Sequence, residues 1–230
     1  MNRIDIVQRF INHRKARNYL EIGVKKGNLF LNVRARKKLA VDPVIKISAK
    51  RKRKYYWRNL FNIFNEYYEM TSDHFFATQS ARLARLKRVD VAFIDGLHTY
   101  QQTLADVYNC LKYLSKNGAI LMHDCSPQSE VQACPAQSRE HADRISPDGK
   151  APEWSGDVWK TIVNLRSTRP DLDVFVLNCD YGIGVITYGR PEKRLEISGA
   201  KIAAMSYQHL EENREELLNL KPPEYLTKFL

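Results

Sequence analysis

Five short apolar segments of the sequence each end in acidic or polar side chains, and helical patterns separate them. The segments end at Glu21, at Asp42, at residues 71–73, at Asp95, and at His123 and Asp124. Strands that alternate with helices predict a mostly parallel sheet with helices on both of its faces. Ligands bind such a sheet outside the carboxyl ends of its strands. We therefore expect these segments to deliver polar groups to one ligand site.

The apolar periodicity predicts the order of the elements. Ile4, Val7, Phe10 and Ile11 recur at helical spacing, which predicts an N-terminal helix within residues 1–16. Strands are expected up to Glu21 and Asp42 and over residues 67–70, 91–94, 118–122, 173–178 and 182–189. Further helices are expected over about 100–114, from about Asp157, and over about 200–218. Ser72 is the expected N-cap of a helix, because its hydroxyl can accept from the free N–H groups of the first turn.

Length and composition predict one folded domain. A chain of 230 residues with 43% apolar residues can bury one large core, so we expect a single domain over residues 1–230. Residues 125–154 contain four prolines and little periodicity, and we expect an insertion loop there that has few apolar anchors. Residues 198–230 are expected to form a C-terminal helical tail.

Four cysteines without a Cys-x-x-Cys pair favour a reducing compartment. The charged N-terminal stretch lacks the apolar centre of a signal peptide. No apolar run approaches the roughly 18 residues that a transmembrane helix needs. We therefore expect a cytoplasmic protein without a transmembrane segment.

The net charge of +11 is concentrated in one stretch of the chain. Residues 34–58 carry eleven Lys or Arg residues and one acidic residue, interleaved with Tyr55, Tyr56 and Trp57. Three interpretations stay open. The stretch is a solvated loop, a surface that recruits an anionic small substrate or the membrane that carries one, or a nucleic-acid contact.

Residues 20–28, LEIGVKKGN, have the composition of a ligand-binding turn. Gly23 and Gly27 allow a tight turn and a close backbone approach to a ligand, and Glu21 can accept hydrogen bonds from hydroxyl or ammonium groups. Lys25 replaces a glycine of the dinucleotide pattern G-x-G-x-x-G, and no Gly-Lys-Ser/Thr of a phosphate-binding loop follows. Asp42, about twenty residues later, is spaced to bind the hydroxyls of a ribose.

Taken in order, four motifs resemble a class I S-adenosylmethionine (SAM)-dependent methyltransferase: E-x-G-x-x-x-G (21–27), V-D-P (41–43), F-I-D-G-x-H-x-Y (93–100) and H-D (123–124). They are similar to the branch called methyltransferase family 24, which includes macrocin O-methyltransferase-like enzymes. The similarity spans roughly residues 17–190. It implies an α/β fold with a Rossmann-like, doubly wound sheet of seven mostly parallel strands and an antiparallel C-terminal hairpin.

The resemblance also implies a SAM site. The implied cofactor-binding residues are Glu21, Gly23, Gly27, Asp42, Ser72, Asp73 and Asp95. The first three would hold the methionine moiety and the fourth would bind the ribose. Ser72 and Asp73 would lie beside the adenine, and Asp95 would lie next to the sulfonium.

In the macrolide-sugar relatives, a magnesium ion is held by an aspartate and an acidic pair, and a nearby histidine acts as the base. Asp95 and Asp124 match the metal ligands, and His98 matches the base, so that Asp95 and His98 are the catalytic candidates. His123 stands where those relatives tend to have an acid. Magnesium prefers oxygen ligands, so an imidazole favours a softer ion or no metal at all.

Each of these residues also has a plainer interpretation. Asp95 and Gly96 could form a simple turn, and His98 could be a residue at a helix entry that bonds only to backbone. His123 could plug the end of a strand, and Asp42 before Pro43 could be a turn residue. Trp154, Asp157 and Trp159 flank a helix start as packing and dipole residues or as part of an acceptor site. The order of all the motifs favours the functional interpretation.

Methyl transfer to a hydroxyl needs a base for the hydroxyl proton, which a histidine can supply near neutral pH. The sequence thus predicts a SAM-dependent O-methyltransferase for a sugar, an anionic acceptor or another small hydroxylated metabolite, with a homo-oligomer left open. The alternative is a basic nucleic-acid-associated protein or RNA methyltransferase with the same fold, although no added RNA-binding module is visible. A third alternative is a fold without catalysis, against which the intact Glu21, Asp42, Asp95 and His98 argue.

Overall fold

The computed structural model describes residues 1–230 except residues 87 and 152. The described residues form eight strands in the hydrogen-bonded order β3-β2-β1-β4-β5-β7-β6-β8. The chain divides into two compact units. The first comprises Met1–Gly96 and Asp106–Leu121, and the second comprises Leu97–Ala105 and Met122–Leu230.

The first unit contains the parallel strands that the sequence predicts. Its strands are β1 (Asn18–Ile22), β2 (Lys37–Val41), β3 (Asn65–Tyr68), β4 (Val89–Ile94) and all but the last residue of β5 (Leu114–Met122). In the parallel pairings of β1, Ile22 lies opposite Val41 of β2 and opposite Ile94 of β4. The residues that follow these three strands therefore start from the same level of the sheet.

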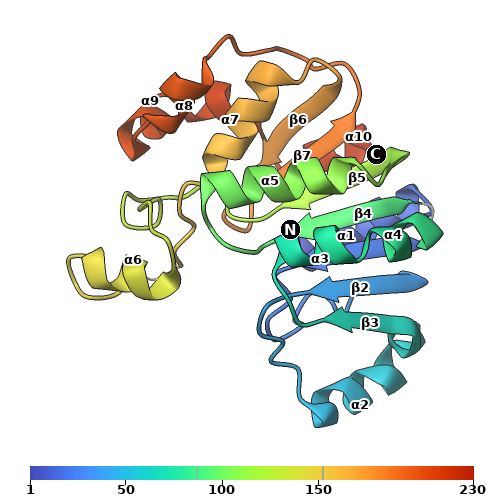
Figure 1. The fold of residues 1–230 in the computed structure, drawn as a ribbon. Coiled ribbons are helices and arrows are strands. Elements are labelled where there is room, and N and C mark those ends of the chain that lie inside the picture. The colour runs from blue at the N-terminus through green and yellow to red at the C-terminus, as the bar shows by residue number, and fades with distance from the viewer. Residues whose placement is uncertain (87, 152) are drawn as a thin grey trace. The chain divides into compact units, whose positions relative to one another are not determined.

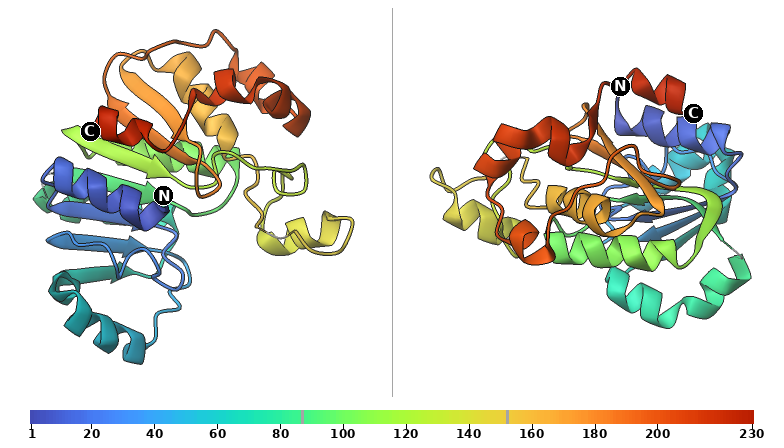
Figure 2. Two further views of the ribbon diagram at one scale, coloured as in Figure 1. Left: turned by 180° about the vertical axis from the view of Figure 1, so that it is seen from behind. Right: turned by 90° about the horizontal axis from the view of Figure 1, so that it is seen from above.

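Helices lie on both faces of these strands. They are α1 (Arg3–His13), α2 (Ala49–Arg58), the 3-10 helix η1 (Leu60–Phe64), α3 (Ser72–Thr78) and α4 (Ser80–Leu86). Figure 2 shows α1 on one face and the α3–α4 pair on the other. Helix α1 buries Ile6, Val7, Phe10 and Ile11, so its apolar stripe faces the strands as the helical spacing predicts.

The second unit is built around the C-terminal strands. Strand β6 (Leu172–Leu177) pairs antiparallel with β7 (Ile183–Tyr188), which confirms the expected hairpin, and parallel with β8 (Leu220–Lys221). The helices are α6 (Arg139–Ile145), α7 (Trp159–Thr168), α8 (Gly199–Ala203), α9 (Tyr207–Leu218) and α10 (Tyr225–Phe229). Helix α5 (Tyr100–Leu111) begins in the second unit and ends in the first.

The structure corrects four expectations from the sequence. The N-cap of α3 is Thr71, whose side chain accepts from the backbone of His74, and Ser72 is the first helical residue. The third strand begins at Asn65, two residues before the expected start. The fifth begins at Leu114 and not at Gly118, so the strand continues N-terminal to its apolar centre. The sheet has eight strands because the tail adds the two-residue β8 along β6.

The segment from 125 to 154 is not a plain loop. It contains α6, and the buried Ala136, Ala142, Ala151 and Trp154 form a small hydrophobic cluster against which Val131 packs. The Trp154 indole N–H donates to the carbonyl of Cys134 at 2.7 Å. The expectation of few apolar anchors was therefore wrong, because alanines at scattered positions give no periodic signal. Pro152, one of the prolines in this segment, lies outside the described residues.

All four cysteines are free in the structure. Among the described residues, no helix is both long and apolar enough to span a lipid bilayer.

Candidate functional site

The first unit places three of the predicted residues directly after adjacent strands. Gly23 follows β1, Asp42 follows β2 and Asp95 follows β4. Two backbone hydrogen bonds fix this arrangement: the Gly23 N–H donates to Val41 at 2.9 Å, and the Asp95 N–H donates to Ile22 at 2.8 Å. The ladder thus continues one residue past the strand ends, and the three positions are held side by side.

Only glycine fits at position 23. Its φ is +90°, and a Cβ built there would lie 1.8 Å from the backbone carbonyl oxygen of Asp95. The chain after β1 therefore passes directly against the end of β4, which only a residue without a Cβ allows. Gly27, the second predicted glycine, is buried later in the same turn, where its N–H donates to the carbonyl of Val24.

Asp42 joins the turns that follow β1 and β2. One carboxylate oxygen accepts from the backbone N–H of Lys25 and the other from that of Val44, each at 2.7 Å. Asp42 is 9% exposed. Asp42 is thus a turn residue, as its plainer interpretation predicts. Each carboxylate oxygen still has a second lone pair, so the same side chain can accept from ribose hydroxyls.

Glu21 is a buried carboxyl that has a protein donor. The Tyr19 hydroxyl donates to its Oε2 at 2.6 Å. Burial raises the pKa of Glu21 to about 8, and the Tyr19 hydrogen bond and the charge of Lys38 act against this shift. Burial also raises the pKa of Tyr19 well above its ordinary value. A cationic ligand group at Glu21 would favour the ionised carboxylate.

Lys38 is a buried ammonium that the sequence reasoning missed. Its Nζ donates to the carbonyls of Phe30 and Val33 and to Oδ1 of Asn62, at 2.6, 2.9 and 2.5 Å. Burial lowers its pKa to about 7, against the attraction of Glu21. The signal was available: Lys37 and Lys38 are adjacent in a strand, so one of them must point toward the interior.

The remaining predicted cofactor residues, Ser72 and Asp73, open helix α3. Ser72 is buried and Asp73 is exposed. Both stand in the first turn of α3, which follows β3 after Glu69, Met70 and Thr71. They therefore follow β3, the strand next to β2. A site built across the carboxyl ends of β1, β2 and β3 requires this placement.

Asp95 has a cationic partner that sequence reasoning also missed. Arg3, from the start of α1, places Nη1 3.0 Å from Asp95 Oδ2, and both side chains are about a quarter exposed. A guanidinium from the helix before the first strand thus faces a carboxylate at the end of the fourth. Nothing in the local sequence around Arg3 indicates this contact.

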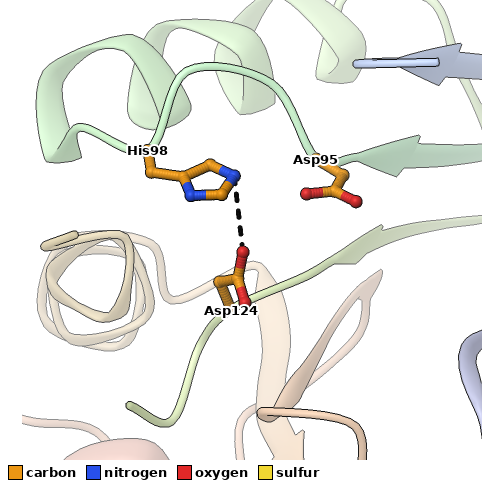
Figure 3. Close-up of side chains that lie close together, drawn as sticks. All are labelled: Asp95, His98 and Asp124. Atoms are coloured by element: carbon orange, nitrogen blue, oxygen red, sulfur yellow. Dashed lines mark ion pairs between the residues drawn. The ribbon is translucent and has the colours of Figure 1, made fainter. Parts of the chain in front are cut away.

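In the second unit, His98 and Asp124 face each other. His98 Nε2 lies 3.4 Å from Asp124 Oδ2, a contact that is an ion pair when the ring is protonated, and Figure 3 draws it as a dashed line, with Asp95 at the end of β4. His98 Nδ1 lies 2.6 Å from the backbone carbonyl of Trp154. A carbonyl only accepts, so Nδ1 carries a proton and donates to it. The neutral ring therefore has its lone pair on Nε2, the atom that faces Asp124.

The segment around Gly156 packs tightly on the backbone of His98. The φ of Gly156 is +61°, and a Cβ there would lie 1.9 Å from the His98 carbonyl oxygen. Asp157 accepts from the backbone N–H of Tyr100 at 2.7 Å, and so satisfies a free amide at the start of α5. Trp154 and Trp159 are buried, which agrees with their packing interpretation.

Asp124 lies at the centre of a second set of contacts. Its Oδ1 lies 3.0 Å from His123 Nδ1, and the Ser155 hydroxyl donates to the same oxygen at 3.1 Å. The Nε2 atom of His123 lies 3.3 Å from Oδ1 of Asp180. Asp124 has a φ of +61°, which is uncommon for a residue other than glycine and is concentrated at functional sites. Ser155 and Asp180 join this site without any sequence signal.

A family model matches part of the chain. The model Methyltransf_24, described as "Methyltransferase domain", matches residues 20–125. This range begins at β1 and ends one residue after Asp124. A comparison with curated proteins finds no significant match.

Several solved structures share the fold. An O-methyltransferase from Bacillus cereus, in complex with S-adenosylhomocysteine (SAH), is 16% identical with a TM-score of 0.54, over 81% of this chain and 80% of that chain. SAH-bound PaMTH1 from Podospora anserina is 18% identical with a TM-score of 0.54, over 81% and 77%. TomG from Streptomyces achromogenes, an O-methyltransferase in complex with SAM, is 12% identical with a TM-score of 0.55, over 80% and 78%.

At these identities the structural likeness establishes the fold, and the family model adds the methyltransferase domain. The matched range contains the strand-end residues Glu21, Gly23, Asp42 and Asp95. The methyltransferase family 24 model thus matches residues 20–125 of the chain, and together with the shared fold this match indicates a SAM-dependent methyltransferase.

Proposed function

We propose that the enzyme transfers the methyl group of SAM to a hydroxyl group of a small acceptor, with His98 as the general base. The observation that carries this proposal is the fixed imidazole: Nδ1 donates to the Trp154 carbonyl, and Nε2 faces Asp124. The structural neighbours whose titles name O-methyltransferases support the choice of oxygen as the acceptor atom.

The residues of the first unit fit the cofactor. Gly23 lets the turn after β1 pass against the end of β4, Glu21 offers a buried carboxyl for the amino group of methionine, and Asp42 offers lone pairs for the ribose. Gly27 shapes the turn, and Ser72 and Asp73 would lie beside the adenine. Asp95 would lie next to the sulfonium. When bound, SAM supplies a methyl group on a positively charged sulfur, which is a good leaving group.

His98 and Asp124 would then handle the proton. A neutral alcohol is a poor nucleophile, so its proton must leave as the new C–O bond forms. Nε2 of His98 accepts that proton, and the imidazolium that results is stabilised by the Asp124 carboxylate. The Trp154 carbonyl holds the ring in one tautomer throughout, because it accepts from Nδ1 in both protonation states.

The proposed metal set of Asp95, His123 and Asp124 fits a magnesium ion poorly. Both ring nitrogens of His123 face carboxylate oxygens, Nδ1 toward Asp124 and Nε2 toward Asp180. Magnesium prefers oxygen ligands, and an imidazole offers only nitrogen. We therefore derive no step through a cation, and chelation tests this choice directly.

The acceptor is proposed to be a sugar or another small hydroxylated metabolite, including an anionic one. We expect a cytoplasmic enzyme and leave a homo-oligomer open. The comparisons do not favour the alternative of a nucleic-acid-associated protein or RNA methyltransferase.

The test begins with calorimetry of SAM and SAH binding. A screen of hydroxylated acceptors then follows the gain of one methyl group by mass spectrometry, with and without exhaustive chelation. O-methylated product that survives chelation supports the proposal as stated. Product that disappears on chelation and returns with a divalent ion would show that the reaction needs a cation. A protein that binds SAM but methylates only nitrogen or RNA would contradict the proposed acceptor class.

A further inference from the structure

Residues 49–64, which we call the α2–η1 surface, combine a basic helix with exposed apolar side chains. Helix α2 has the sequence AKRKRKYYWR, with six basic residues, no acidic residue and no buried residue. The 3-10 helix η1 follows it as LFNIF. Figure 1 shows α2 next to β3, the edge strand of the first unit.

The burial pattern in the second half of this surface is the reverse of the usual one. Asn59 and Asn62 are 7% and 1% exposed, although asparagine is usually a surface residue. The apolar residues beside them face outward, at 84% exposure for Trp57, 64% for Leu60, 44% for Phe61, 59% for Ile63 and 64% for Phe64. Among the described residues, ten large hydrophobic side chains are exposed, and five of them lie within residues 57–64.

This reversal is built into the packing. The Asn59 side-chain amide donates to the carbonyls of Leu31 and Val33, and the Asn62 amide donates to Leu31 and Tyr55. The buried Lys38 ammonium donates to Oδ1 of Asn62. Turning the apolar residues inward would expel both asparagines, and the buried carbonyl of Leu31 and the ammonium of Lys38 would each lose hydrogen-bond partners, which is costly. The apolar side chains are therefore fixed in the outward orientation.

We propose that the α2–η1 surface binds the face of a membrane that contains anionic phospholipids. Lys and Arg side chains of α2 contact lipid phosphates, and Trp57, Leu60, Ile63 and Phe64 enter the headgroup region. Basic residues beside exposed aromatic and aliphatic residues are the composition of segments that lie in the membrane interface. An exposed apolar cluster of this density marks an interaction surface.

The chemistry of the surface disfavours two other occupants. In a symmetric dimer through this face, six cationic residues of one helix would meet the same six on the partner, and like charges repel. Nucleic-acid interfaces are polar, and Leu60 and Ile63 offer neither a hydrogen bond nor an aromatic ring to a base. A lipid headgroup layer accommodates both the charges and the aliphatic side chains.

The experiment uses the full chain and vesicles of two compositions, phosphatidylcholine alone and phosphatidylcholine with phosphatidylserine. Flotation measures binding, and tryptophan fluorescence measures insertion. Of the three tryptophans, Trp57 is 84% exposed while Trp154 and Trp159 are buried. A blue shift on adding vesicles therefore reports Trp57. We expect binding and a blue shift with the anionic vesicles, and at least about tenfold weaker binding without phosphatidylserine.

Two sets of variants separate the apolar and charge contributions. Ile63→Ser with Phe64→Ser, and separately Lys50→Gln with Arg53→Gln and Lys54→Gln, should each weaken vesicle binding by about tenfold or more. Their matched controls are Ile145→Ser, and Arg85→Gln with Lys112→Gln and Lys116→Gln, which remove an exposed apolar residue and three exposed charges elsewhere. The controls should change binding by less than about twofold. All of these residues are exposed, so each variant should fold, as circular dichroism would check.

Three results would overturn the proposal. The first is no binding to anionic vesicles, and the second is an equal loss in the charge variant and its control, which would make the attraction a property of the net charge alone. The third is a concentration-dependent dimer, seen by light scattering, that the Ile63→Ser and Phe64→Ser variant abolishes, because the surface would then be an interface between copies. Retention on RNA with no vesicle binding would likewise assign the surface to nucleic acid.

Discussion

The acidic residues of the two units differ in the partners that they keep. In the first unit, Asp42 accepts from two backbone amides and Asp95 pairs with the Arg3 guanidinium. Amides and guanidinium groups do not change their charge anywhere near neutral pH. The partners of these carboxylates therefore keep their charge near neutral pH, as suits residues that bind a cofactor.

In the second unit, Asp124 and Asp180 have imidazole partners. Asp124 faces His98 and His123, and Asp180 faces His123. Imidazole is the side chain whose charge changes between about pH 5 and pH 8. The difference indicates a division of tasks, with a fixed binding frame in one unit and a group of residues that can move a proton in the other. Glu21 is the exception in the first unit, because its raised pKa makes it titrate near neutrality.

The largest effect is expected in the second unit, whose residues are proposed to move the proton. His98→Ala should lower the methyl-transfer rate by roughly a hundred- to ten-thousand-fold, because it removes the base, and should leave SAM affinity nearly unchanged. Steady-state kinetics with calorimetry measures both quantities. The exposed His13 provides the matched control, and His13→Ala should leave the rate unchanged. Full activity in a folded His98→Ala variant would make this histidine structural.

The second prediction concerns the exception, Glu21. Its folded pKa of about 8 lies above the ordinary value of 4.5, so the folded state keeps a proton that the unfolded state releases. Glu21 should therefore reduce stability as pH rises from about 4.5 toward 8. Lys38, with its pKa lowered to about 7, gives the opposite slope only above pH 7. The window from pH 5 to pH 7 isolates Glu21.

Glu21→Gln should remove this slope. The difference in unfolding free energy between the variant and the wild type should change by on the order of 2–3 kcal/mol from pH 5 to pH 7. Urea unfolding at several pH values measures it, and subtracting the wild-type curve cancels the titration of other groups. The exposed Glu69 supplies the control Glu69→Gln. Parallel curves for wild type and Glu21→Gln would mean that the carboxyl is ionised in the fold.

The third prediction tests the fixed frame. Asp42→Ala should weaken SAM binding by roughly 10- to 100-fold, because a hydrogen bond to a charged group contributes about 1.5–3 kcal/mol and the turns at Lys25 and Val44 lose their shared acceptor. Calorimetry on the folded variant gives the affinity. Asp42→Asn keeps one acceptor oxygen, so its SAM affinity should lie between those of the wild type and Asp42→Ala. SAM affinity unchanged in Asp42→Ala would restrict this residue to its role in the turns.

The smallest effect is expected for Arg3. The Arg3–Asp95 pair is partly exposed, so Arg3→Ala should change the unfolding free energy by less than about 1 kcal/mol. Thermal denaturation checks this value, with Arg9→Ala on the same helix as the control. A larger loss of unfolding free energy would mean that α1 depends on this contact to pack on β4. The guanidinium would then have a structural role in addition to balancing the charge of Asp95.

Much of the first unit was predictable from the sequence because its signals are local. Parallel strands buried on both faces appear as apolar runs, and a glycine or acid directly after such a run marks its carboxyl end. These signals indicated Gly23, Asp42 and Asp95, and the fold places each directly after its strand. The contacts of Arg3 and Lys38 were not predictable, since each partner lies far away in the sequence or is a backbone carbonyl.

The second unit was predicted less well for a related physical reason. The segment 125–154 is held by alanines and one tryptophan at irregular spacing, which produces no helical or strand period. Strand β8 is two residues long, too short to leave a pattern. His98 and Asp124 were indicated by motif, whereas Ser155 and Asp180 reach the site only through the tertiary fold.

The buried ammonium of Lys38 provides a chemical probe of how often the surrounding structure opens. The chain has many exposed lysines that acylate readily, but Lys38 is fully buried and its nitrogen is enclosed by two carbonyls and an amide. An amine-reactive reagent can reach it only when the chain around β2 separates. The rate at which the peptide that contains Lys38 gains the label therefore measures how often that part of the first unit opens. A ligand that tightens the turns at Asp42 should slow that labelling while leaving the surface lysines unaffected.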